Sequence, residues 1–271
     1  MYRARDKVPR CFFSLAYKKA GSEAQILSLG AGFDTLFWRL LDEGYEFANF
    51  TEVDFPEVTT KKIHLIEKET TALLDRIADN DSDVEIVEHV SLLSPRYNLL
   101  GCDLRSVKDL SHKLQSTSLS SSAPTLILCE CVLIYMSADQ SARLLTFIAS
   151  RFQQCCMVNY EQVNIDDKFG HVMQDNLYHR GVCLAGVKAC RSLQSQQQRF
   201  LDAGFSAVNV WTLSQVYAKL SATERKRIES LEFLDEVELL FQLLDHYCIC
   251  VATRDPAKLT FTEIGFSQAE L

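Results

Sequence analysis

The sequence predicts an α/β fold, in which helices cover both faces of a doubly wound, mostly parallel sheet of about seven strands. Two observations lead to this prediction. Strand-like and helix-like segments alternate along most of the 271 residues, and the first apolar run ends in a Gly-x-Gly turn. The length and the 47% hydrophobic content favour one domain, residues 1–271, with a sizeable core.

Short apolar runs bounded by turn residues predict the strands, and apolar residues spaced three and four apart predict the helices. The predicted strands are residues 26–29, 50–53, 84–90, 97–102, 125–131, 155–159, 207–211 and 246–253. The predicted helices are residues 34–43, 57–78, 107–114, 138–152, 195–203 and 222–244.

Residues 162–191 are a polar insertion between the strand that ends at Asn159 and the next predicted helix. Loops in such positions often carry binding residues on a rigid scaffold. We therefore expect this insertion to form a wall or lid on the substrate side.

The charge balance limits the partners that the chain can have. With 28 Lys and Arg against 36 Asp and Glu, the formal net charge is −8, which argues against an extended nucleic-acid footprint and against binding to an anionic membrane. No apolar run reaches the roughly 20 residues of a membrane span, and residues 1–10 are not followed by a signal-peptide core. These observations predict a cytoplasmic protein with neither nucleic acid nor membrane as a partner.

The cysteines and histidines do not form a metal-binding pattern. The ten cysteines lie mostly in apolar runs, without a CxxC pair or zinc-type spacing, so we expect reduced thiols in the core. The six histidines are scattered, and His246, at the start of the last predicted strand, is expected to be structural.

The stretch QILSLGAGFDT, residues 25–35, places Gly30 and Gly32 at the end of the first predicted strand. Glycines at this point let a ligand approach the backbone N–H groups closely. Thr35 stands where a dinucleotide fingerprint needs a third glycine or an alanine, and no Gly-Lys-Ser/Thr of a phosphate loop follows. The turn therefore favours a cofactor without phosphates.

Three carboxylates follow or end later strands. Asp54 ends the second strand, where it can accept hydrogen bonds from the hydroxyls of a ribose. Asp103 can accept from an adenine amino group while the N–H of Leu104 meets a ring nitrogen, although a helix cap or turn role is the alternative. Glu130 interrupts an apolar strand, which is unfavourable unless the carboxylate is paired, so either a ligand site or a structural ion pair is expected.

These residues belong to longer stretches in which the sequence resembles class I S-adenosylmethionine-dependent methyltransferases, and among them the leucine carboxyl methyltransferase family. The resemblance runs in order from about residue 2 to residue 253, nearly the whole chain, and it rests on LGAGFDTLFWRL, EVDFP, DLR, ECVLIYM, YEQVN and RIESLEFLDEVELL. It implies a Rossmann-like sheet whose last strand is antiparallel, and S-adenosylmethionine as the cofactor.

The resemblance also implies roles for individual residues. It assigns the methionine part of the cofactor to the turn of Gly30 and Gly32 and to Glu130, the ribose to Asp54, the adenine to Asp103 and Leu104, and the cofactor carboxylate to Arg5.

The family that the sequence resembles has two branches. One branch esterifies the C-terminal leucine carboxylate of the protein phosphatase 2A catalytic subunit, and the other acts in transfer-RNA wybutosine synthesis. The segment RIESLEFLDE, residues 227–236, resembles the phosphatase-methylating branch more closely. Family members begin several tens of residues earlier, with N-terminal helices that cap the pocket. The resemblance therefore leaves a catalytically silent, N-terminally shortened binding protein with weaker cofactor affinity as an alternative.

A C-terminal carboxylate is already ionised at pH 7, since its pKa is about 3.3–3.7, so its methylation requires no general base. The acidic cofactor site would repel this acceptor, and we expect an arginine beside it, with Arg5 and Arg39 as candidates. Tyr135, Tyr160 and Glu161 follow the ends of predicted strands and are assigned to the acceptor pocket. Packing roles are the alternative for these three residues.

Overall fold

The computed structural model describes residues 21–69, 73–78, 83–231 and 234–255. Its centre is a nine-stranded sheet with the strand order β3-β4-β5-β2-β1-β6-β7-β9-β8. The strands are β1 (Gln25–Leu29), β2 (Asn49–Asp54), β3 (Glu85–Val87), β4 (Ser91–Leu93), β5 (Tyr97–Gly101), β6 (Thr125–Glu130), β7 (Cys155–Gln162), β8 (Ala207–Thr212) and β9 (Tyr247–Arg254).

The five central strands, β5-β2-β1-β6-β7, are all parallel. From β1 the chain builds outward through β2 to β5 and then crosses to β6 on the other side of β1, so the strand order reverses between β1 and β6. Ligands of doubly wound sheets bind outside the carboxyl ends of the strands at such a reversal. The topology therefore places a ligand site where β1, β2, β5 and β6 end.

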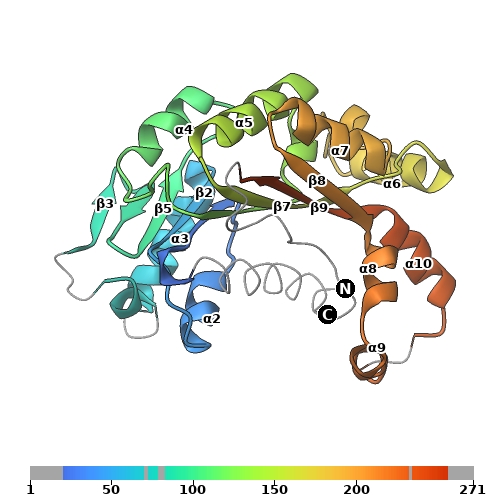
Figure 1. Ribbon diagram of the computed structural model, residues 1–271, viewed down its shortest axis with the longest axis horizontal. Helices are drawn as coiled ribbons and strands as arrows, with labels where there is room; N and C mark the ends of the chain where they lie inside the picture. The colour runs from blue at the N-terminus through green and yellow to red at the C-terminus, as the bar shows by residue number, and fades with distance from the viewer. Residues whose placement is uncertain (1–20, 70–72, 79–82, 232–233, 256–271) are drawn as a thin grey trace.

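Helices cover both faces of the sheet (Figure 1). One face packs against α4, α5 and α7, and the other packs against α2, α3 and α8. Among the residues the structure describes, no helix is long and apolar enough to cross a membrane. The helices are α2 (Leu36–Asp42), α3 (Pro56–Lys68), α4 (Val107–Leu114), α5 (Ala138–Arg151), α6 (Lys168–His179), α7 (Leu193–Asp202), α8 (Leu213–Lys219), α9 (Ala222–Glu229) and α10 (Val237–Asp245).

The strands divide their side chains between two hydrophobic cores. In β1 every residue is buried, Ile26 packs with α2 and α3, and Leu27 packs with α4 and α5. Successive side chains of a strand point to opposite faces, so adjacent apolar residues such as Ile26 and Leu27 can serve both cores. This explains why β1 has no polar alternation in the sequence.

The mostly parallel sheet and the antiparallel last strand are confirmed, but the sheet has more than the expected seven strands. Residues 84–90 were expected to be one strand; the chain instead turns after β3, with positive φ at Glu88 and His89, and β4 pairs back on it. The predicted helix at residues 222–244 is two helices, α9 and α10, and the one at 57–78 ends at Lys68. Helix α6 lies inside the insertion of residues 162–191, and α8 was not predicted.

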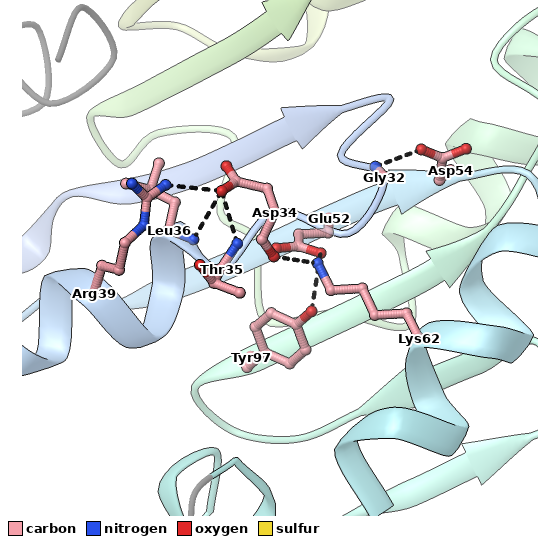
Figure 2. Close-up of polar contacts among 9 residues, drawn as sticks. All are labelled: Gly32, Asp34, Thr35, Leu36, Arg39, Glu52, Asp54, Lys62 and Tyr97. Carbon is pink, nitrogen blue, oxygen red and sulfur yellow. Dashed lines mark hydrogen bonds and ion pairs between the residues drawn. The ribbon is translucent and has the colours of Figure 1, made fainter. Parts of the chain in front are cut away.

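A buried polar network ties β2, α3 and β5 together (Figure 2). The carboxylate of Glu52, which is 1% exposed, pairs with the ammonium of Lys62 and accepts a hydrogen bond of 2.9 Å from the hydroxyl of Tyr97. Burial raises the pKa of Glu52, and Lys62 and Tyr97 oppose this shift. Lys62 also donates to the carbonyl oxygen of Asp34 at 2.6 Å, so the same network reaches the loop that follows β1.

Replacing Lys62 with methionine is expected to lower the free energy of unfolding by about 3–5 kcal/mol, because the substitution leaves the Glu52 carboxylate buried without its cation. Urea denaturation followed by the fluorescence of Trp38, whose ring lies 5.8 Å from the ammonium, measures the effect. The double variant Glu52→Gln, Lys62→Met removes both charges and should recover more than half of the loss. A loss below about 1 kcal/mol in the single variant would contradict the network's structural role.

Candidate functional site

A pocket of about 280 Å³ lies at the carboxyl ends of β1, β2, β5 and β6. This volume is close to the lower end of the range for small-molecule sites. The pocket is lined by Gly30, Asp54, Phe55, Cys102, Asp103, Leu104, Arg105, Glu130, Cys131, Val132, Tyr135 and Met136.

The turn after β1 requires glycine at its first position. Gly30 has φ +68°, and a Cβ atom built there would lie 2.4 Å from Cγ2 of Val132, so any other residue would be strained and would clash with the opposite wall of the pocket. The N–H groups of Gly30 and Ala31 donate to the carbonyl oxygen of Val53 in β2, at 2.8 and 3.3 Å. The turn is therefore held against the neighbouring strand.

Asp54 connects the turn to the end of β2. Its Oδ2 accepts a hydrogen bond of 2.7 Å from the N–H of Gly32 (Figure 2), and its Oδ1 accepts one of 2.7 Å from the N–H of Phe55. Each carboxylate oxygen has a further lone pair. Asp54 can therefore support the turn and accept hydrogen bonds from ligand hydroxyls at the same time.

Asp34 organises the start of α2. It directly precedes Thr35, the position at which a dinucleotide site would have its third glycine. Its Oδ1 accepts hydrogen bonds from the N–H groups of Thr35 and Leu36, at 2.7 and 3.1 Å, and pairs with the guanidinium of Arg39 at 2.8 Å (Figure 2). Arg39 is therefore engaged at the first turn of α2 and does not belong to the pocket lining.

Asp103 and Leu104 line the pocket just beyond β5. The carboxylate of Asp103 accepts from the backbone N–H of Arg105 at 2.9 Å and forms an ion pair with its guanidinium at 2.6 Å. The hydrogen bonds from Arg105 lower the pKa of Asp103. The expected turn role of Asp103 is thus present, and it coexists with a place in the pocket wall.

Beyond β6, the chain bends sharply into the pocket wall. Glu130 ends β6, and Cys131 has φ +52° while its N–H donates to the carbonyl oxygen of Tyr160 at 2.7 Å. The 3₁₀ turn η4 (Leu133–Tyr135) follows and presents Tyr135, which is 49% exposed, at the pocket. A positive φ at a residue other than glycine is uncommon, and here it occurs at the pocket wall.

The other predicted acceptor residues lie elsewhere. Tyr160 and Glu161 are within β7, which continues to Gln162 instead of ending at Asn159. Tyr160 stacks on Tyr247, with ring centroids 5.3 Å apart, while Glu161 is fully buried; neither lines the pocket. Arg5 lies outside the described residues.

Arg105 is a pocket residue that the sequence reasoning missed. Its guanidinium lies 5.7 Å from the ring centroid of Phe55, and together they close one side of the pocket. The signal was available, because Arg105 stands two residues after Asp103 in the DLR motif, within reach of an Asp side chain in a turn.

A second groove and a metal centre are the two alternatives to this pocket, and neither is as well suited to be the functional site. A more open groove of about 900 Å³ lies beside α10 and the loop after β7, but it contains no glycine turn. Within the described ranges, no cluster of three or more His, Cys, Asp or Glu side chains could hold a metal ion. His246, which borders the groove, is buried and pairs with Asp167 at 3.0 Å, as a structural histidine would.

Comparisons with known proteins show the family to which the chain is related. The family model described as leucine carboxyl methyltransferase matches residues 1–149. Leucine carboxyl methyltransferase 1 of Rattus norvegicus is 43% identical over 249 residues, which are 92% of this chain and 75% of the relative. The tRNA wybutosine-synthesizing protein 4 of the same species is 36% identical over 87% of this chain, but over only 34% of its own length.

Among solved structures, a putative methyltransferase from Thermobifida fusca YX superimposes with a TM-score of 0.56 over 91% of this chain and 80% of its own, at 15% identity. At this identity the likeness shows the fold alone, which is the class I methyltransferase fold. The sequence relatives and the family match go further: the chain belongs to the leucine carboxyl methyltransferase family, whose cofactor is S-adenosylmethionine.

Proposed function

We propose that this methyltransferase transfers a methyl group from S-adenosylmethionine to the C-terminal leucine carboxylate of the protein phosphatase 2A catalytic subunit. The observation that carries the proposal is the 43% identity, over nearly the whole chain, to a leucine carboxyl methyltransferase. We place the activity in one domain and in the cytoplasm, where thiols stay reduced. The seven buried cysteines in the described part of the chain are free thiols, which fits that compartment.

The pocket fits the cofactor chemically. Asp54 offers carboxylate oxygens to ribose hydroxyls, while Leu104, which is buried, and Phe55 offer apolar surface to a base. Glu130 provides negative charge on the wall that faces the glycine turn, which suits a sulfonium cation. Arg105, the one cation in the described lining, is already paired with Asp103, so the pocket is better suited to a cationic nucleoside than to a phosphate.

When bound, S-adenosylmethionine supplies a methyl group on a positively charged sulfur. The acceptor carboxylate is already ionised at pH 7, so the protein has no proton to remove. Its contribution is to align the carboxylate with the methyl group and to exclude water around the two. This is consistent with a described lining that contains no histidine or lysine.

The acceptor side needs a hydrogen-bond donor that offsets the repulsion between the acidic pocket and the acceptor carboxylate. Asp54, Asp103 and Glu130 would repel an incoming carboxylate. Tyr135 stands at the pocket with about half of its surface exposed, and its hydroxyl can donate one hydrogen bond to the acceptor. We assign Tyr135 this role. Arg5, which lies outside the described residues, remains the proposed partner of the cofactor carboxylate.

The substrate can be tested with methyl-labelled cofactor and the phosphatase 2A catalytic subunit, beside a version that lacks the terminal leucine. We expect base-labile label on the intact subunit only, because a carboxyl methyl ester hydrolyses in base. Cofactor binding without label on any acceptor would favour the catalytically silent binding protein. In a parallel reaction with transfer RNA, label on the RNA and none on the subunit would place the chain with the wybutosine branch.

Replacing Asp54 with alanine is expected to weaken binding of S-adenosylhomocysteine, the product form of the cofactor, by roughly 10-fold or more, since hydrogen bonds to a charged group contribute about 1.5–3 kcal/mol each. Titration calorimetry measures the affinity without any acceptor. Asp175→Ala, at an exposed position of α6, is the matched control and should bind like the wild type. A change below about threefold in Asp54→Ala would exclude Asp54 as a cofactor residue.

Replacing Tyr135 with phenylalanine is expected to raise KM for the acceptor by about tenfold and to leave the cofactor affinity within about twofold, because only the donated hydrogen bond is lost. Steady-state kinetics at saturating cofactor separate the two effects. Tyr178→Phe, on the exposed surface of α6, controls for the loss of a hydroxyl. An unchanged acceptor KM would remove Tyr135 from the acceptor site.

A further inference from the structure

The turn η4 forms part of one wall of the pocket. It follows β6, it carries Tyr135, and the residues on either side of it, Val132 and Met136, also line the pocket. Leu133 and Ile134 are fully buried. Any shift of this turn would therefore move one whole wall of the pocket.

The carboxylate of Glu161 lies under this turn and accepts a hydrogen bond from a backbone N–H of the turn. Its Oε2 accepts a hydrogen bond of 2.9 Å from the backbone N–H of Ile134, and its Oε1 accepts one of 3.4 Å from the N–H of Gln162. Glu161 itself is fixed in β7, between β6 and β9. The bond thus links the turn to the middle of the sheet.

The insertion of residues 162–191 donates a hydrogen bond to a backbone carbonyl oxygen of the same turn. The N–H of Gly186 donates to the carbonyl oxygen of Ile134 at 2.8 Å. A Cβ atom at position 186 would lie 2.7 Å from the carbonyl oxygen of Met136 and 2.8 Å from that of Leu133. Glycine is therefore needed for this close approach, and the turn is clamped between β7 and the insertion.

Burial is the main cause of a pKa of about 7 for Glu161, and the Arg199 charge and the backbone N–H donors oppose it. The guanidinium of Arg199 is itself bonded to Gln196 and Ser141, at 3.2 and 3.0 Å. Other titratable groups interact with Glu161 from the surrounding elements: Cys129, Tyr135, Cys190, Tyr247 and Cys248.

We propose that Glu161 is a positioning residue, which fixes the pocket wall of residues 131–136, and with it Tyr135, through the backbone N–H of Ile134. The proposal replaces the expected direct contact of Glu161 with the acceptor, because the carboxylate is buried and absent from the pocket lining. The proposal rests on the proposed function only for the identity of the acceptor. Its effect on cofactor binding does not depend on that identity, because the same wall also borders the cofactor.

The test compares Glu161→Ala, Glu161→Gln and Met157→Ala. Met157 is fully buried four residues earlier in the same strand, and its side chain has no carboxylate that could accept a hydrogen bond from the turn, so its variant controls for a general loss of stability. Glutamine keeps one oxygen for the Ile134 N–H, whereas alanine leaves that donor buried and unpaired. We expect Glu161→Ala to weaken S-adenosylhomocysteine binding at least fivefold and to speed amide exchange at residues 131–136, and we expect Glu161→Gln to restore both within twofold.

The acceptor kinetics add a second readout. Glu161→Ala should raise KM for the acceptor, and in a Tyr135→Phe background it should add less than twofold, because both changes act on the same contact. Cofactor affinity and amide exchange report on the turn even if the acceptor proves to be another molecule. Wild-type values of both in Glu161→Ala, or equal changes in Met157→Ala at the same melting temperature, would overturn the proposal.

The pH dependence has a defined sign. The pKa of Glu161 is raised from its ordinary 4.5 to about 7 in the folded chain, so between these values the folded protein retains a proton that the unfolded chain has lost. The contribution of this group to stability therefore decreases as the pH rises through this window. Glu161→Gln should flatten this part of the stability profile, while an unchanged profile would contradict the buried, titrating carboxyl group.

Discussion

The ion pair of Glu52 and Lys62 beneath the glycine turn is the interaction on which the rest of the site depends. Glu52 fixes β2 just before Val53 and Asp54, the two residues that receive the N–H groups of the turn. Lys62 holds the loop on the other side of the turn through the carbonyl oxygen of Asp34. A buried ion pair seldom stabilises a fold more than apolar residues would, so its value here is geometric: it sets the position of one strand end relative to the turn.

Much of this arrangement could be predicted from the sequence, because local chemistry determines it. Gly30 must adopt a positive φ and leave room for the opposite wall, and Asp54 stands directly at a strand end. Both features appear within a few residues of an apolar run. The parallel order of the strands then brings Gly30, Asp54, Asp103 and Glu130 to one edge of the sheet, and the structure places all four around one pocket.

The contacts that the sequence reasoning missed join residues far apart along the chain. Tyr97 reaches Glu52 across 45 positions, and no local pattern indicates that pairing. Tyr160 and Glu161 were assigned together to one pocket, yet neighbouring residues of a strand point to opposite faces. The error was the predicted end of β7: once the strand continues to Gln162, alternation alone separates Tyr160, which stacks on Tyr247, from the carboxylate under the turn η4.

The two walls of the pocket therefore rest on buried carboxylates of different kinds. Under the glycine turn, the charge of Glu52 is balanced by the ammonium of Lys62, and the carboxylate accepts a hydrogen bond from the phenol of Tyr97. Loss of the cation therefore leaves a charge that cannot reach water. Under the opposite wall, Glu161 is held mainly by main-chain N–H groups, and a neutral amide offers the same acceptor. The first wall requires that its buried charges remain paired, whereas the second requires only an oxygen atom in the right place. The carboxylate acceptor that we propose would benefit from this difference, because the acceptor side is then ordered without a permanent negative charge near the incoming carboxylate.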